Sequence, residues 1–85
     1  MIEVNKRTEE EFTVTVIEEG KAKYIVTLDD EYYKDLTGER ISKEELIKKS
    51  FKFLLKRERK ESILSRFNLK VINRYFPEFE KEIKA

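Results

Sequence analysis

The middle of this chain, residues 23–57, constrains its fold more than any other segment. Over residues 23–28 apolar and polar side chains alternate, which indicates a β-strand with one buried face. The acidic pair at 29–30 then begins a short helix, and Gly38 suits the left-handed position that ends one. Ser42, with a glutamate three residues later, forms a capping box for a longer helix. The predicted order is therefore strand, short helix, tight turn and long helix.

A second alternating segment precedes this strand. Residues 12–16 alternate between apolar side chains and threonines, as a half-buried strand does. Residues 18–21 between the two strands include a glycine, which supplies the positive φ that a tight hairpin turn needs. The two strands are therefore predicted to form a β-hairpin. Residues 1–10 are polar and acidic, and they are expected to be either a flexible arm or an early strand.

The C-terminal part predicts further short helices. Residues 61–67 read as one helix, and Asn68 caps another over residues 69–75. Pro77 cannot continue that helix but suits the first turn of a last one over residues 78–84. We therefore predict a single small α+β domain of 85 residues. It has an N-terminal β-hairpin followed by a short helix, a long amphipathic helix and two or three short C-terminal helices.

Several residue types that carry chemistry are absent from this chain. It has no cysteine, no histidine and no tryptophan, and its two glycines are Gly20 and Gly38. The sequence therefore lacks a thiolate nucleophile, a zinc–thiolate site, the usual base near neutral pH and a glycine-rich phosphate loop. We expect a protein that is not an enzyme, with no metal, no cofactor and no small-molecule substrate.

Acidic clusters are the remaining candidates for chemistry. Residues 9–11 and 29–31 each carry three carboxylates, and paired carboxylates can serve acid–base catalysis or hold Mg²⁺ or Ca²⁺. The second cluster begins a helix, where negative charge is favourable in itself. A structural role is therefore the interpretation that we favour for it.

The apolar runs of the chain are short. They extend for two or three residues, as at 53–55, so neither a membrane-spanning helix nor the core of a signal peptide is expected. We predict a cytoplasmic protein with no membrane partner. The abundance of lysine and glutamate resembles the composition of proteins from hot environments.

The charged residues are segregated along the chain. Residues 1–31 hold nine acidic and four basic residues, a balance of −5, whereas residues 42–60 hold eight basic and three acidic ones, a balance of +5. Six of these bases fall within about a third of the circumference of the long helix, opposite its apolar side. They are Lys48, Lys49, Lys52, Lys56, Arg59 and Lys60.

This basic face has two interpretations. A row of cations with few acids between them is typical of a surface that follows phosphates or meets an acidic partner. The alternative is an ordinary solvated face, on which Glu44 pairs with Lys48 and Glu45 with Lys49 at a spacing of one helical turn. Both interpretations remain open from the sequence.

The apolar side of the long helix is unusually wide. Such a stripe favours contact on two sides of the helix, and a chain of 85 residues buries only roughly 60–65% of its unfolded surface. We therefore expect a homodimer that buries Phe51 or Phe53 between its chains. The residues of the stripe are Leu46, Ile47, Ser50, Phe51, Phe53 and Leu54.

Aromatic residues are frequent in the tail. Aromatic rings beside basic residues can stack on nucleic-acid bases, but here they alternate with apolar partners at helical spacing, which favours a place in the core. Tyr33 or Tyr75 is the residue that we expect to be exposed, since a tyrosine side chain tolerates contact with water at its polar end. The aromatic residues concerned are Tyr32, Tyr33, Phe67, Tyr75, Phe76 and Phe79.

Residues 24–36 (Tyr-Ile-Val-Thr-Leu-Asp-Asp-Glu-Tyr-Tyr-Lys-Asp-Leu) and 38–47 (Gly-Glu-Arg-Ile-Ser-Lys-Glu-Glu-Leu-Ile) resemble the ribbon-helix-helix repressors and antitoxins of the Arc and MetJ type. In that family, strands from two chains pair into a ribbon that enters the major groove of DNA. The start of the second helix grips a phosphate. By position, the resemblance implies three base-reading residues and two phosphate-binding residues. They are Lys23, Ile25 and Thr27, and Ser42 and Lys43, respectively.

A second resemblance concerns the tail. Residues 62–67 and 74–79 resemble the C-terminal part of small bacterial proteins with no assigned function. Two functions are therefore considered. The first is a binding module for protein–protein interaction, whose basic helix meets an acidic partner or whose hairpin edge accepts a strand. The alternative is a DNA-binding regulator or antitoxin related to the ribbon-helix-helix proteins.

Overall fold

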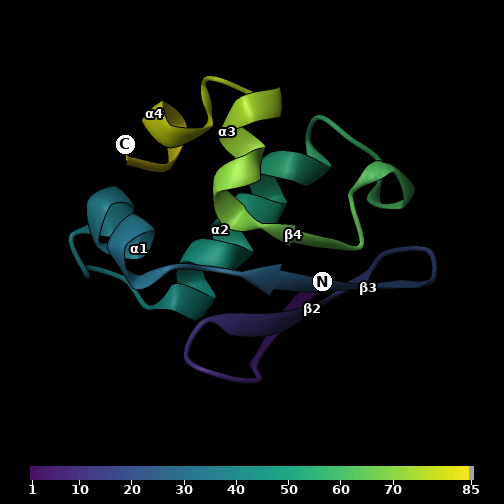
Figure 1. The fold of residues 1–85 in the computed structure, drawn as a ribbon. Coiled ribbons are helices and arrows are strands. Elements are labelled where there is room, and N and C mark those ends of the chain that lie inside the picture. The colour runs from purple at the N-terminus through teal and green to yellow at the C-terminus, as the bar shows by residue number, and fades with distance from the viewer. Residues whose placement is uncertain (85) are drawn as a thin grey trace.

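The centre of the fold is a four-stranded mixed sheet, seen in a computed structural model that describes residues 1–84 (Figure 1). Strands β1 (Ile2–Lys6), β2 (Glu11–Ile17) and β3 (Lys21–Thr27) are antiparallel, and β4 (Arg66–Asn68) runs parallel to β3. The strands lie in the order β1-β2-β3-β4. The α+β class and the hairpin β2–β3 are confirmed, whereas β4 was not predicted.

The hairpin follows from the alternation in its sequence. Phe12 on β2 lies opposite Val26 on β3, and both side chains are fully buried on the face that the helices cover. The turn between the strands places Gly20 at a φ of 111°, a value that side-chain-bearing residues rarely adopt. For residues 1–10 the sequence left two alternatives, a flexible arm or an early strand, and the structure shows the strand β1.

All four α-helices lie on one side of the sheet (Figure 1). Helix α1 (Asp30–Thr37) ends at Gly38, which adopts a φ of 58° and donates its backbone N–H to the Lys34 carbonyl. Helix α2 (Lys43–Leu55) begins where the hydroxyl oxygen of Ser42 accepts the N–H of Glu45 at 3.1 Å. Both helix boundaries therefore agree with the capping signals in the sequence.

The residues after α2 differ from the prediction. A short 3₁₀ helix, η1 (Lys60–Ser62), is followed by an extended segment and β4, in place of a helix over residues 61–67. Strand β4 pairs with Ile25–Thr27 of β3, and the Phe67 ring lies 6.0 Å from the ring of Phe51. These contacts between distant residues outweigh the local preference for a helix.

Three short helical segments complete the described part of the chain, residues 1–84. The second 3₁₀ helix, η2 (Leu69–Val71), leads into α3 (Ile72–Tyr75), and α4 (Phe79–Lys84) follows after a turn. The side-chain oxygen of Asn68 accepts the N–H of Lys70 at 3.0 Å, which confirms the predicted cap. In the described part of the chain, no helix is both long and apolar enough to cross a membrane.

Helix α2 lies between the sheet and the C-terminal helices, which explains its wide apolar stripe. On the sheet side, the Phe51 ring packs at 5.1 Å from Tyr24. On the other side, Phe53 packs edge-on against Phe79 at 5.2 Å. Phe51 is 0% and Phe53 is 6% exposed. The stripe is therefore covered within one chain, and neither ring is available to the dimer interface that we expected.

Candidate binding pocket

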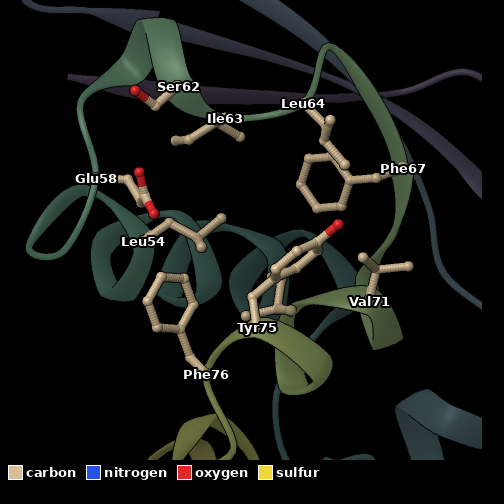
Figure 2. A pocket seen from close by; sticks show the side chains of 10 residues that line it. Leu54, Glu58, Ser62, Ile63, Leu64, Phe67, Val71, Tyr75 and Phe76 are labelled. Carbon is tan, nitrogen blue, oxygen red and sulfur yellow. The ribbon is translucent and has the colours of Figure 1, made fainter.

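An apolar pocket of about 200 Å³ opens between the end of α2, the segment that precedes β4, and α3 (Figure 2). Ile63 and Leu64 form one side, and Tyr75 and Phe76 lie opposite them (Figure 2). Leu54 of α2 contributes to the inner wall. The pocket therefore forms where three successive segments of residues 54–76 fold back against one another at this end of the molecule.

Two large apolar side chains stand exposed at the mouth of this pocket. Ile63 has an extended backbone, and neighbouring side chains in an extended segment point to opposite sides. Ile63 packs against the core, whereas Leu64 is left 52% exposed. On the opposite side, Tyr75 is the last residue of α3 and is 68% exposed. Both side chains are positioned to contact a bound group.

The lining of the pocket is mostly apolar. Its polar side chains are Glu58, Ser62 and the hydroxyl of Tyr75, and the rest of the lining is aliphatic or aromatic. Groups with a clearly shifted pKa, among the described residues, all lie outside the lining. They are Lys6, Tyr24, Asp30, Tyr32, Lys60 and Glu61. The arrangement favours an apolar group held with few hydrogen bonds.

The largest of these pKa shifts, that of Tyr32, makes the stability of the fold depend on pH in the alkaline range. Partial burial raises the pKa of Tyr32 above its ordinary value of 10.0, and its hydroxyl also donates to a Glu80 oxygen at 3.0 Å. The folded state therefore favours the neutral phenol, and this stabilisation is complete below pH 10 and decreases progressively as the pH rises from 10 towards the raised pKa. We expect urea unfolding from about pH 9 to about pH 11 to show a smaller loss of stability for Tyr32→Phe than for the wild type.

The exposed Tyr75 supplies the matched control for this measurement. Tyr75→Phe removes a phenol that is 68% exposed, so its dependence of stability on pH should equal that of the wild type. If Tyr32→Phe also kept the wild-type dependence, burial and the hydrogen bond to Glu80 would not raise the pKa of Tyr32 in the folded state.

The cations of the predicted basic face divide into two groups. Lys48, Lys49 and Lys52 are exposed on α2, and Lys56 is exposed at its C-terminal cap. Because α2 ends at Leu55, the row of cations on this helix does not extend to Arg59 and Lys60, the last two residues of the predicted basic face. Arg59 is exposed in the following loop, and the ammonium group of Lys60 pairs with Glu61 at 2.8 Å.

The residues that the ribbon-helix-helix resemblance implies for base reading lie together on β3. Lys23, Ile25 and Thr27 alternate along this strand on the face that carries no helix. Their strand is internal, however, because β2 pairs with one edge and β4 with part of the other. The N–H of Ile25 also donates to the Ser65 carbonyl at 2.8 Å. The hairpin edge on β3, which we expected to remain free for a strand of a partner, is therefore partly occupied by β4.

The two implied phosphate-binding residues are engaged within the chain. Ser42 caps α2, and the Lys43 ammonium group donates to the Glu9 carbonyl at 2.8 Å and pairs with Asp30. Its side chain is 14% exposed, and its hydrogen bond and charge lower the pKa of the Asp30 carboxyl. Lys43 therefore ties the β1–β2 loop to the start of α1.

The pocket was not predicted from the sequence. Its one usable signal was the apolar pair Ile63 and Leu64, which an extended segment splits between the core and the solvent. Comparisons of the sequence with protein-family models and with curated proteins, and of the fold with solved structures, find no match. The function has to be inferred from the side chains themselves.

Proposed function

We propose that this protein is a small non-enzymatic module that binds a protein partner through the apolar pocket. The pocket volume of about 200 Å³ is smaller than the roughly 300–1,000 Å³ of typical small-molecule sites. It is larger than a cavity of about 150 Å³ that is known to accept a benzene molecule. One large apolar side chain therefore fits the space better than a whole metabolite.

The observation that carries this proposal is the pair of exposed apolar side chains at the mouth. Leu64 and Tyr75 are 52% and 68% exposed and flank the same hollow. Protein interfaces commonly place an anchor side chain in a pocket and surround it with contacts that exclude water. Tyrosine is also enriched in such interfaces. A partner segment that inserts one side chain would cover both residues.

The alternative, a DNA-binding regulator or antitoxin, draws its support from the exposed lysines of α2. Two features favour a protein partner instead. The strand β3 has β2 on one edge and β4 on part of the other, which leaves little of it to form a ribbon with a second chain. Lys43 is held by Glu9 and Asp30 rather than presented to a phosphate.

The proposal can be tested by selecting binders from a random peptide library and measuring their affinity for two tryptophan variants. Ser62→Trp places a large ring in the lining of the pocket, whereas Ser65→Trp adds the same ring at an exposed position outside the lining. We expect selected peptides to share one large apolar residue. Ser62→Trp should weaken their binding by roughly thirtyfold or more, the equivalent of about 2 kcal/mol.

The control variant separates the pocket from a general effect of added aromatic surface. Ser65→Trp should bind the selected peptides within about twofold of the wild type, since exposed substitutions away from a contact change free energies by only about 0.5 kcal/mol. Equal affinity of the wild type and Ser62→Trp would refute binding at this pocket.

A further inference from the structure

The outer edge of β1 carries unpaired backbone groups. At the start of β1, Met1 and Ile17 exchange hydrogen bonds of 2.9 and 2.8 Å, and after its end Arg7 donates to the Glu11 carbonyl at 2.8 Å. In an antiparallel pair the hydrogen-bonded positions alternate, so residues 2, 4 and 6 direct their N–H and C=O groups away from β2. Since β1 is the first strand in the sheet order, no strand among residues 1–84 covers this edge.

Helix α2 lies over this edge of the sheet. The helix packs against β1, and two observations near its ends indicate which of its sides lies toward the strand. The pKa of Lys6 is raised mainly by its hydrogen bond to Glu9, and also by the charge of Glu44 in the first turn of α2. At the far end, Leu55 lines a surface hollow with Glu18 of the β2–β3 turn.

The position of Lys48 follows from these two ends. It is four residues after Glu44 and seven before Leu55, and at about 100° per residue all three fall on one side of α2. Lys52 is one turn further along the helix. Both lysines are exposed, and neither belongs to an ion pair among residues 1–84. Two lysines without an ion-pair partner among residues 1–84 therefore lie on the side of α2 toward the open edge of β1.

The open edge of β1 and the nearby lysines together favour one kind of molecule as the occupant of the edge. A second copy of this chain, paired through β1, would bring its own Lys48 and Lys52 toward those of the first, and like charges repel. A nucleic acid could meet the lysines, but its phosphates offer acceptors alone, whereas a strand edge presents alternating donors and acceptors. A peptide backbone matches that alternation.

We infer that β1 accepts an extended acidic segment of a partner protein as an additional strand beneath the lysines of α2. Side chains of an added strand alternate between the two faces of the sheet. Every second residue would therefore point toward α2, with its stem against Val4 and its head near Lys48. Glutamate at alternate positions fits both contacts. This surface is separate from the apolar pocket, and the inference does not depend on it.

A peptide of about ten residues that alternates threonine and glutamate is a suitable probe. We expect it to bind and to shift the amide resonances of Ile2, Val4 and Lys6 most strongly. A peptide of the same composition, with its threonines and glutamates in separate blocks, should bind at least about tenfold more weakly. Equal binding of the two peptides would overturn the strand-addition model in favour of simple charge attraction.

Charge-reversal variants test the role of the lysines. The double variant Lys48→Glu/Lys52→Glu should weaken the binding of the alternating peptide by roughly tenfold or more, because the attraction between the lysines and the peptide glutamates becomes repulsion. The matched control is Lys34→Glu/Lys81→Glu, which makes the same change in net charge at exposed sites on α1 and α4. The control should stay within about twofold of the wild type. Equal losses in the two double variants would overturn the inference.

The backbone of β1 can be tested separately. Val4→Pro removes an N–H that faces away from β2, so proline is tolerated in the fold but cannot donate to an added strand. We expect Val4→Pro to lose peptide binding and Val4→Ala to keep it. Two further results would overturn the assigned occupant: dimerisation of the wild type through β1 in the absence of peptide, or tighter binding of duplex DNA than of the peptide at the same lysines.

Discussion

Phe51→Ala is expected to lower the free energy of unfolding by about 3–5 kcal/mol, the range for deleting a buried phenylalanine ring. Phe51 is 0% exposed and lies 5.1 Å from the Tyr24 ring and 6.0 Å from the Phe67 ring. It therefore joins α2 to β3 and β4 at once. A chain of 85 residues has a total stability of roughly 4–13 kcal/mol, so this one change removes a large part of it.

Urea denaturation followed by circular dichroism measures this loss. Tyr75→Ala is the matched control, because it also deletes an aromatic ring but one that is 68% exposed. The control should change stability by no more than about 0.5–1 kcal/mol. If Phe51→Ala and Tyr75→Ala had similar effects, α2 could not be packed on the sheet as described.

Phe79→Ala should produce a comparable loss of about 3–5 kcal/mol, felt first in the C-terminal helices. Phe79 is 0% exposed and is the buried residue of α4. The other links of α4 include the ion pair of Arg57 with Glu82 at 2.8 Å, the hydrogen bond of Tyr32 to Glu80 at 3.0 Å and the partly buried side chain of Ile83. Exposed ion pairs contribute only about 0–1 kcal/mol, so they cannot replace the ring.

Amide hydrogen exchange distinguishes local detachment from global unfolding. We expect the amides of α4 to exchange faster in Phe79→Ala, with a smaller change in β2, because regions of a protein can open separately. Glu82→Gln removes one ion pair of Arg57 and should change stability by less than about 1 kcal/mol. Wild-type protection of α4 in Phe79→Ala would contradict the role assigned to this ring.

The parts of the fold that the sequence predicted are those with local signals. The hairpin follows from alternation in residues 12–16 and 23–28 and from the turn at Gly20. Helix α2 follows from the cap at Ser42 and a wide apolar stripe. In each case the deciding interaction lies within a few residues, so a single sequence carries enough information.

The parts that the sequence did not predict depend on contacts between distant residues. Residues 61–67 have a helical pattern in the sequence. In the fold, the backbone N–H of Ile25 on β3 donates to the Ser65 carbonyl, and the chain is extended here and forms β4. The pocket depends on the same change, because extension is what leaves Leu64 exposed. The prediction that Phe51 or Phe53 lies between two chains was wrong because it overlooked the C-terminal helices, which cover Phe53 within the chain.

The central claim is that the apolar pocket takes one large side chain of a protein partner. Nuclear Overhauser contacts between a library-selected peptide and the methyl groups of the protein test this claim most directly. Binding at the pocket predicts contacts from the large apolar residue of the peptide to Leu54, Leu64 and Val71, which line the hollow. Contacts to Ile25, on the face of the sheet that carries no helix, with none to the pocket methyls, would contradict it.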